Sequence, residues 1–432
     1  MARHFTNEDR TSTWNITKGG DLWVVGQQAH FQIDGTGIDT NGFSNTRIKI
    51  FGDLTTSSND ECGINATGGK TSIFVGATSN ITVSGAAAVA IGGDGKNVSI
   101  VNHGHLESGE WGVNLNNGGN VFNDGTIRGE TGIEIACKDQ NAAGRVTNER
   151  LIDADSVGVD MTGLSSSATD TAAGAKTTAT MINGEDGIIR SDNIGIIFRG
   201  TDGNRLVNDG IIRAPRAMID EDVSTTVINR GKIFGNVLLE GGNDTFITRG
   251  GSIDGKVYGG AGSDTYIITG ISPLQGFQIV EGIFKGVDTV KSSVSYTLGD
   301  YVENLVLLGN AQEATGNALD NRLVGSNKEN TLSGYQGNDI LDGRKGDDIL
   351  HGHLGDDIFV FSRDYDRDTI LGFEDGADKL KVEGMDSIYD YSAFSTKIHQ
   401  VGVNVEIDLG NGDVLILEGM SKANISVSDF EY

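Results

Sequence analysis

Asp and Asn side chains recur every nine residues between Gly316 and Val360, each in a turn that begins with glycine. The five consecutive units read GNALDNRLV, GSNKENTLS, GYQGNDILD, GRKGDDILH and GHLGDDIFV. Position six is Asp or Asn and position eight is Leu or Phe in every unit. Turn carbonyls and a carboxylate are the oxygen ligands that a hard cation prefers, and this nonapeptide pattern is typical of calcium-binding repeats. The spacing therefore predicts a Ca²⁺-binding array.

The nine-residue period also predicts the local structure. Positions one to six form a turn in which glycine accepts positive φ angles. Positions seven to nine form a short strand whose central residue points into a core. Two units then make one coil of eighteen residues, so loops on the same side of the coil lie two units apart. We expect a cation between two such loops, held by an Asp of one loop and by carbonyls of both.

Two cation sites are predicted in this way. Asp339 is expected to share an ion with the loop of residues 352–357, whose Asp357 lies eighteen residues after Asp339. Asp348 is expected to share an ion with the next, degenerate loop, which supplies Asp364 and Asp366. A Gly- and Asp-rich loop region that binds no metal is the alternative interpretation.

Further copies of the unit modify the prediction. Asn321 and Asn330 hold position six of the first two units, so those sites lose a charge and are expected to be weaker. A separate copy, GGAGSDTYI at Gly259–Ile267, matches every position, and GGNDTFI from Gly241 offers a carboxylate about one coil earlier. The candidate metal ligands, all in or beside such turns, are Asp244, Gly259, Gly260, Gly262, Asp264, Asn330, Gly334, Gly337, Asp339, Gly343, Gly346, Asp348, Gly352, Gly355, Asp357, Asp364, Asp366 and Asp368.

The stretch resembles the RTX (repeats-in-toxin) family, which implies a calcium-loaded parallel β-roll. VKSSVSYTLGDYVENLVLLG at 290–309 is similar to the strands between RTX blocks, and DTILGF at 368–373 with the following DKL at 378–380 is similar to the closing segment. The tail at 407–432 resembles the C-terminal export signal of type I secretion substrates. The resemblance implies a roll over 241–380 and a β cap with the secretion signal over 381–432. It names no activity, because RTX proteases, lipases, epimerases, adhesins and surface-layer proteins share these features.

Composition limits the partners. Lys plus Arg is 33 and Asp plus Glu is 60, a net charge of −27. This charge argues against nucleic acid and anionic membranes as partners. The 64 Gly and only 2 Pro fit tight turns between hydrogen-bonded strands. No apolar signal-peptide region begins the chain and no run reaches transmembrane length. Cys62 and Cys137 form either one bridge or two free buried thiols.

A looser repeat precedes the nonapeptides. An Asn that opens a turn before a β-branched strand recurs at steps of 21, 25, 35, 25 and 21 residues, at Asn102, Asn123, Asn148, Asn183, Asn208 and Asn229. Units of this size with two or three strands predict a right-handed parallel β-helix over 1–240, with irregular coils at 14–100 and regular coils at 101–240. The recurring Asn predicts an internal ladder of stacked amides. The polar stretch 163–180 is expected to bulge as a loop, and Leu22–Val25, or the first fifteen residues, to cap the open end.

The upstream repeats resemble the passenger β-helices of autotransporters, which concerns architecture only. An enzyme must be considered, because long β-helices often act on polysaccharides. The sequence contains no HExxH, no GxSxG and no Asp-Pro-His cluster of the mannuronan epimerase kind. Arg128, Arg190 and Arg213 form either a basic ladder for a lyase or a solvated face paired with acids.

Two histidine pairs and the tryptophans complete the candidates. His103 with His105, and His351 with His353, suit either a transition-metal chelate or exposed turns, and the turn positions favour the latter. Three Trp and nine Tyr are too scattered for a sugar-stacking platform.

Three functions remain open. The favoured one is a non-enzymatic, extracellular, calcium-dependent structural or adhesive protein that is exported by type I secretion and folds on binding Ca²⁺, with self-assembly into a layer or filament as an extension. The alternative is a polysaccharide lyase or epimerase acting on a uronan through the β-helix. The third is a passive adhesin for a glycan or another cell-surface ligand.

Overall fold

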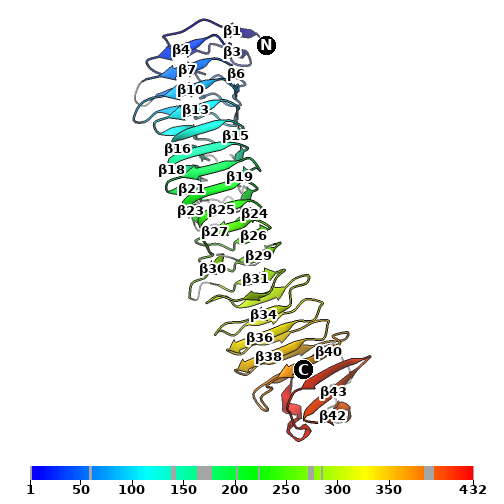
Figure 1. Cartoon of the computed structure of the whole chain (residues 1–432). Coiled ribbons are helices and arrows are strands. Elements are labelled where there is room, and N and C mark those ends of the chain that lie inside the picture. The colour runs from blue at the N-terminus through cyan, green and yellow to red at the C-terminus, as the bar shows by residue number, and fades with distance from the viewer. Residues whose placement is uncertain are drawn as a thin grey trace, which may run out of the picture. The chain divides into compact units, whose positions relative to one another are not determined.

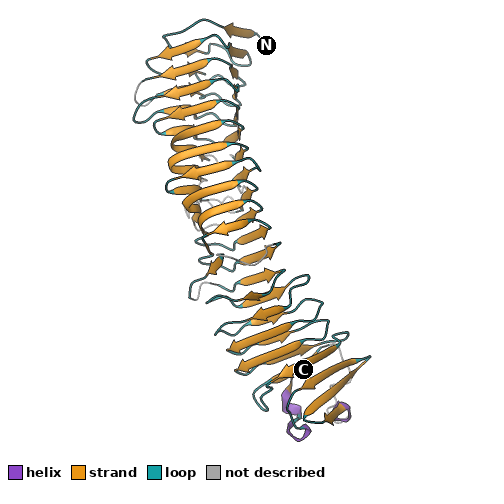
Figure 2. Ribbon diagram, viewed as in Figure 1, coloured by secondary structure: helices purple, strands orange, loops and turns teal. Residues whose placement is uncertain are grey.

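The computed structural model describes residues 2–57, 61–137, 143–162, 178–200, 203–221, 224–270, 277–283, 286–383 and 394–431. Their regular structure is almost entirely β-strand, joined by turns and loops (Figures 1 and 2). The helices in this part of the chain are short 3-10 turns, at Ser395–Lys397, Lys422–Asn424 and Val427–Asp429. The prediction of an all-β solenoid is confirmed. Among these residues no helix has the length and apolar character that crossing a membrane requires.

The chain divides into two compact units. The first contains Met1–Thr245, Gly250–Ala261 and Gly276–Gln278. The second contains Phe246–Arg249, Gly262–Gln275 and Ile279–Tyr432.

The first unit is a parallel β-helix whose coils stack in register. One face is a ladder of parallel strands, namely β1 (Arg3–Thr6), β3 (Leu22–Val25), β6 (Arg47–Ile50), β9 (Ser72–Val75), β12 (Val98–Asn102), β15 (Gly119–Asn123), β17 (Gly144–Asn148), β19 (Thr180–Asn183), β22 (Asn204–Asn208) and β24 (Thr225–Asn229). The second face is the ladder β4 (His30–Ile33), β7 (Asp53–Thr56), β10 (Asn80–Val83), β13 (His105–Ser108), β16 (Thr126–Ala136), β18 (Leu151–Thr162), β20 (Ile188–Ser191), β23 (Ile211–Glu221), β25 (Lys232–Leu238) and β27 (Ser252–Asp254). A third run joins β2 (Trp14–Asn15), β5 (Ile38–Asp39), β8 (Cys62–Asn65), β11 (Val89–Gly93) and β14 (Trp111–Leu115) to the later parts of β16 and β18, and then to β21 (Ile194–Arg199), β23, β25 and β28 (Lys256–Tyr258).

Alternation along each strand explains the stacking. In β12, Val98, Ile100 and Asn102 are buried, whereas Ser99 and Val101 are half-buried on the outer side. The inward residue of each coil stacks on the same position of the next, so Ile73 lies beside Ile100, and Ile100 beside Val121. Burying each of these side chains stabilises the coil by about 1.5–3 kcal/mol. One slip in register would turn this set outward, which fixes the pairing.

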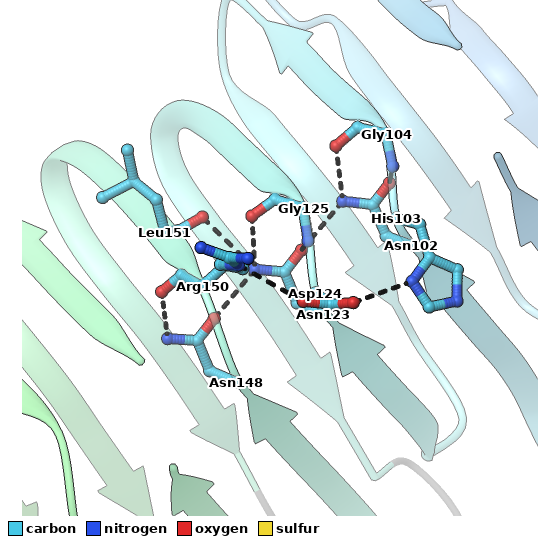
Figure 3. A network of polar contacts seen from close by, with 9 residues as sticks. All are labelled: Asn102, His103, Gly104, Asn123, Asp124, Gly125, Asn148, Arg150 and Leu151. Carbon is cyan, nitrogen blue, oxygen red and sulfur yellow. Dashed lines mark hydrogen bonds and ion pairs between the residues drawn. The ribbon is translucent and has the colours of Figure 1, made fainter. Parts of the chain in front are cut away.

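The predicted asparagine ladder is confirmed. The amide Nδ2 of each ladder Asn donates to Oδ1 of the next, with N···O distances of 2.8 to 2.9 Å from Asn102 through Asn229. Figure 3 shows the part of the ladder from Asn102 to Asn148. The six side chains are fully buried. Each Nδ2 also faces turn carbonyls, as Asn148 does with those of Arg150 and Ile188. The ladder therefore satisfies the buried polar groups of the turns without any ion.

Breaking one rung is expected to destabilise the first unit. Asn148→Ala removes the acceptor of Asn123 Nδ2 and the donor to Asn183 Oδ1, so that buried groups lose partners at a cost of about 2–4 kcal/mol. Urea unfolding in saturating calcium measures the loss. Asn120→Ala, on the exposed side of β15, is the matched control. A midpoint equal to that of the control would contradict the role of the ladder.

One of the two caps expected for the first coils is excluded. Leu22–Val25 does not cap the helix end, because β3 pairs on both sides, with β1 and with β6. The terminal strand is β1, within the first fifteen residues. Trp14 and Trp23 are buried against one another in these coils, at 5.4 Å between ring centroids.

Of the predicted loop 163–180, residues 163–177 lie outside the described residues.

Both cysteines are free thiols. Cys137 is buried, whereas Cys62 is half-buried, and burial raises the pKa of Cys62 to about 11. A thiol with such a pKa is protonated at neutral pH and a poor nucleophile.

The second unit stacks parallel coils, and those of the nonapeptide stretch repeat at eighteen residues. One ladder contains β29 (Thr265–Thr269), β31 (Thr289–Ser292), β33 (Asn304–Leu307), β35 (Arg322–Val324), β37 (Ile340–Asp342), β39 (Ile358–Phe361), β41 (Lys379–Val382) and β45 (Phe430–Glu431). The other contains β32 (Tyr296–Thr297), β34 (Glu313–Thr315), β36 (Thr331–Gln336), β38 (Ile349–Leu354), β40 (Arg367–Leu371) and β44 (Asp413–Leu417), to which β43 (Asn404–Gly410) and β42 (Ile398–Val401) add antiparallel. Short strands β26 (Thr245–Arg249) and β30 (Gln278–Val280) complete the described strands. Leu323 lies beside Leu341, and Leu341 beside Phe359, so position eight forms the core as predicted.

Candidate calcium-binding site

The position-six carboxylates form columns along the second unit. Oδ1 of each Asp accepts a hydrogen bond from the backbone N–H of the equivalent residue one coil earlier. Asp339 accepts from Asn321 at 2.7 Å, Asp357 from Asp339 at 2.8 Å and Asp378 from Asp357 at 3.0 Å. On the opposite side, Asp348 accepts from Asn330 at 2.7 Å and Asp368 from Asp348 at 2.9 Å. One oxygen of each carboxylate therefore holds the coils together.

The second carboxylate oxygen has no partner in three complete loops. Oδ2 of Asp339, Asp348 and Asp357 is buried and makes no hydrogen bond in the structure. It faces the glycine that opens its own loop, where a Cβ on Gly334, Gly343 or Gly352 would stand 1.9 to 2.3 Å from it. A buried anionic oxygen without a partner is costly unless it is paired with a cation. This arrangement fits Ca²⁺, whose ligands are carboxylate and carbonyl oxygens.

The two asparagine loops differ at the same point. The oxygen that faces the opening glycine is Oδ1 of Asn321 or Asn330, and it accepts the N–H of loop position two, from Asn317 at 2.7 Å and from Ser326 at 2.6 Å. Each Nδ2 donates to a carbonyl of the preceding coil. These loops thus satisfy their own polar groups, which supports the prediction that they bind calcium more weakly.

Backbone conformation separates the two kinds of loop. Position two has a positive φ in the complete loops, 83° at Tyr335, 69° at Arg344 and 73° at His353. Position four is a glycine with φ between 104° and 140° in the same loops. Non-Gly residues adopt such angles at a cost. Asn317 and Ser326 do not show positive φ, so the conformation accompanies an available carboxylate oxygen.

Burial raises the pKa of every carboxyl in these columns. The pKa of Asp339 rises to about 7, of Asp357 to about 6, and of both Asp348 and Asp368 to about 8. Desolvation is the main cause, and neighbouring carboxylates add to it, such as Asp357 beside Asp339. The columns are therefore only partly ionised near neutral pH, and a divalent cation would favour their full ionisation.

Calcium-free protein is expected to be more stable at pH 5 than at pH 8. A carboxyl with a raised pKa in the folded state binds its proton more tightly there than in the unfolded chain. Its stabilising contribution is fully present below the unfolded pKa of about 3.9 and is lost as pH rises through the folded values, here 6 to 8. Urea unfolding in chelator should give a free energy of unfolding that is at least about 2 kcal/mol higher at pH 5 than at pH 8. Equal midpoints would contradict the raised pKa values.

The degenerate loop is arranged differently from the prediction. The backbone amides of Asp364 and Asp366 donate to the carboxylate of Asp413, at 3.0 and 3.1 Å. The Asp366 carboxylate accepts from Gly346, at 3.1 Å, and the exposed Asp364 carboxylate lies 3.8 Å from Lys345. The geometric equivalent of position six is instead Asp368, because the step between the loops lengthens from eighteen to twenty residues.

The sequence analysis did not predict two Asp carboxylates of this unit that accept a backbone N–H from the preceding coil. Asp378 continues the Asp339–Asp357 column after a step of 21 residues. Asp288 accepts from the backbone of Asp264 at 2.8 Å, and buried oxygens of Asp264, Asp288 and Glu281 lie within 4.8 Å of one another. Neither segment keeps glycine at position one, so the nonapeptide pattern does not reveal them. A glycine two residues before the Asp, at Gly376 and Gly286, is the signal that remains.

The upstream candidates show similar local geometry. Oδ1 of Asp244 accepts the N–H of Thr225 at 2.6 Å within the first unit. Positions two and four of its loop, Glu240 and Gly242, have φ of 46° and 106°. In the segment from Gly259, φ is 93° at Gly260 and 133° at Gly262.

The alternative catalytic and metal candidates are engaged in other contacts. Arg128 and Arg190 both pair with Asp153, at 3.4 and 2.6 Å, and Arg213 packs over Phe234 at 3.9 Å. The expectation of a solvated face paired with acids is thus met at the first two.

The two histidine pairs have different surroundings. His103 bonds to Asp124 at 3.1 Å and His105 to Glu107 at 3.0 Å, so the two rings have different partners. All four histidines are half-buried rather than exposed, which corrects the prediction. His351 and His353 follow one face of β38, and their rings stack with centroids 3.4 Å apart.

Comparison with known proteins agrees with this geometry. Residues 315–350, 324–359 and 336–368 match the family described as the RTX calcium-binding nonapeptide repeat (4 copies). No curated protein matches the chain. Among solved structures, the extracellular lipase LipA from Serratia marcescens is similar at 17% identity over 59% of this chain, with a TM-score of 0.19. The chain spans only 44% of that lipase, and a TM-score this low bears on neither fold nor activity.

Proposed function

We propose that this chain, whose residues 315–368 are RTX calcium-binding nonapeptide repeats, is an extracellular structural or adhesive protein that folds when calcium binds. One observation carries the proposal. The buried Oδ2 atoms of Asp339, Asp348 and Asp357 have no protein partner and face the glycine cradles of their own loops. Calcium supplies the missing positive charge, and it does so only when the coils are stacked.

The proposed ligands are the carboxylates and turn carbonyls of these loops. Asp339 and Asp357 belong to one column and Asp348 and Asp368 to the other. The loop glycines leave room for carbonyls to approach a cation. We add Asp378 to the ligand set, because its carboxylate continues the first column. The loops of Asp244 and Asp264 are proposed as further sites.

Linkage between binding and folding gives the mechanism. Calcium binds the folded roll and not the unfolded chain, so it shifts the equilibrium by mass action. Extracellular modules typically bind with Kd of about 10⁻⁴ to 10⁻³ M, so cytosolic calcium leaves such sites empty. The acidic roll then remains unfolded before export and folds outside. Export by type I secretion is part of the proposal and rests on the resemblance of the tail.

The enzymatic alternative gains no support from the described residues. A lyase on the β-helix needs a base and a free cationic group near the reacting carbon. Arg128 and Arg190 both pair with Asp153, so neither guanidinium is free of a carboxylate partner. Self-assembly into a layer or filament likewise has no observation in its favour.

A calcium titration followed by far-UV circular dichroism tests the proposal. We expect a rise in β-signal with a midpoint near 10⁻⁴ to 10⁻³ M calcium. Magnesium at equal concentration is the control, because it demands octahedral geometry and retains its waters. A spectrum that does not change on adding calcium to chelated protein would overturn the proposal.

A further inference from the structure

A column of glycines forms a furrow on the first unit. The second residue after each ladder Asn is glycine in most coils, and a Cβ there would meet the turn backbone of the preceding coil. For Gly125, Gly210 and Gly231 that contact would be 2.1 Å from a glycine carbonyl. Close stacking therefore favours glycine along this line, with Arg150 in the Asn148 coil as the exception. The missing side chains leave a furrow that crosses successive coils.

Two hollows belong to this furrow. One of about 600 Å³ is lined by residues that include His103, Asp124, Arg150 and Ile188. The other, of about 380 Å³, is lined by residues that include Ile211 and Arg230. Ile188 and Ile211 are register partners in β20 and β23, so the hollows adjoin. From the coil of Asn102 to that of Asn229 there are five steps of about 4.8 Å, or roughly 24 Å of furrow.

The two walls differ in chemistry. One wall is aliphatic, where Leu151, Ile188 and Ile211 follow one another in register on the outer face. Ile188 is 38% exposed, although it is large and apolar. The other wall carries planar polar groups held in fixed positions. His103 and Arg150 converge on Asp124, at 3.1 and 3.4 Å (Figure 3).

The polar wall continues along the furrow. Arg230 binds both oxygens of Asp209, with Nη2 2.8 Å from Oδ2. Asp124 and Asp209 are thereby oriented while both arginines remain substantially exposed. Arginine has five N–H donors, so each guanidinium retains donors for a ligand. A hydroxyl both donates and accepts, and therefore suits a wall of alternating carboxylates and guanidinium groups.

Charge restricts the ligand. No ion pair in the described part of the chain neutralises Glu149, Glu185 or Asp186, which lie together in the middle of the furrow. Burial raises the pKa of Glu149, and repulsion from Asp124 and Asp186 raises it further. The furrow therefore disfavours polyanions such as uronans.

The turn backbone restricts the ligand further. The N–H that follows each ladder Asn donates to the preceding coil, as Asp124 does to Asn102 and Asp209 to Asn183. An extended peptide that adds to a sheet edge needs unpaired backbone groups, and these turns lack them. The ligand must instead be recognised by side chains. At one end, the rings of Phe74 and Phe122 flank His103, with centroids 5.4 and 6.1 Å from it, and add apolar surface.

We propose that this furrow binds a neutral polysaccharide chain. The hydroxyls contact the Asp, Arg and His wall, and the C–H faces pack on the aliphatic wall. The open furrow accepts several successive sugar units. The proposal deepens the adhesive function proposed above and rests on it.

Affinity electrophoresis in native gels with calcium tests this site. The gels contain laminarin, dextran, galactomannan or xylan, with alginate and heparin as polyanions. An unfolded polypeptide, carboxymethylated α-lactalbumin, probes the peptide alternative by fluorescence anisotropy. We expect at least one neutral polysaccharide to retard the protein. Arg150→Ala and Ile188→Asp, both at exposed positions, should raise the dissociation constant for that polysaccharide at least about tenfold.

Matched controls are Arg205→Ala and Val403→Asp, which change exposed residues away from the furrow. Both should bind as the parent protein does. Three outcomes would overturn the site: no retardation by any neutral polysaccharide, binding only to polyanions or to the unfolded polypeptide, or equal retardation of the furrow variants and the parent. If the calcium-induced dichroism change persists in such a case, calcium-dependent folding stands and only the furrow proposal fails.

Discussion

Removal of calcium is expected to unfold the second unit and to leave the asparagine-laddered coils folded. With Kd of about 10⁻⁴ M and calcium at 10 mM, a site lies at about 100 Kd and contributes about 2.7 kcal/mol. The three loops of Asp339, Asp348 and Asp357 then supply roughly 8 kcal/mol. This is comparable with the whole stability of a typical domain, about 5–15 kcal/mol. The asparagine-laddered coils, which precede the Asp244 loop, satisfy their buried turn groups with amides, so we expect these coils not to depend on an ion.

Thermal melts monitored by circular dichroism should therefore show two transitions in calcium. The transition of the second unit should move to lower temperature as chelator is added, whereas the Asn-ladder transition should stay in place. Melts in magnesium should resemble those in chelator. A single transition that shifts as a whole would contradict the independence of the β-helix from calcium.

Asp357→Asn is expected to abolish one site and yet to stabilise the calcium-free roll. The amide oxygen can keep the hydrogen bond from the backbone of Asp339, which turns Nδ2 toward the opening Gly352, where an N–H cannot ligate a cation. Calcium-dependent stabilisation should fall by about 2.7 kcal/mol at 100 Kd. In chelator, loss of a buried carboxylate with a raised pKa should add on the order of 1 kcal/mol.

Asp356→Asn is the matched control, because it removes the same charge from the exposed neighbour. Urea unfolding of both variants, each with calcium and with chelator, separates the effects. The control should retain the calcium response of the parent. Equal responses of the two variants would show that net charge alone, rather than the Oδ2 of Asp357, governs the effect.

Periodicity explains how much of the fold the sequence reveals. The nine-residue spacing predicted the eighteen-residue coil, and the structure pairs Leu323, Leu341 and Phe359 at this step. The recurring Asn predicted the ladder even across the 35-residue step from Asn148 to Asn183, because the buried amide column admits insertions only in the loops between its rungs. The sequence period therefore predicts directly which residues stack on one another in successive coils.

Departures from the period were harder to read. The step to Asp368 is twenty residues. Asp364 and Asp366 offered equally plausible carboxylates, but the structure shows their backbone amides donating to Asp413. Asp413 comes from β44, distant in sequence, so no local pattern predicts it. The stacking of His351 on His353 depends on how far β38 extends beyond its nonapeptide. These details follow from tertiary pairing rather than from spacing.

The sequence also did not predict how the position-six carboxylates are oriented. Asp and Asn at position six look interchangeable as turn residues. The structure separates them by the φ of position two and by the partner of the oxygen that faces the opening glycine. Oδ1 of Asn321 accepts a hydrogen bond from Asn317 at that place, whereas Oδ2 of Asp339 has no hydrogen-bond partner there.

Hydrogen exchange resolved by segment tests the central claim most directly, that calcium alone completes the position-six columns. Amides of Asp339 and Asp357 donate to the carboxylates of the next coil, and Asp124 and Asp209 donate across the asparagine coils. On replacing calcium with chelator at pH 7.5, peptides from β37 to β39 should lose their protection, whereas peptides from β15 to β24 should keep theirs. Equal protection of the β37–β39 peptides in calcium and in chelator would contradict the account.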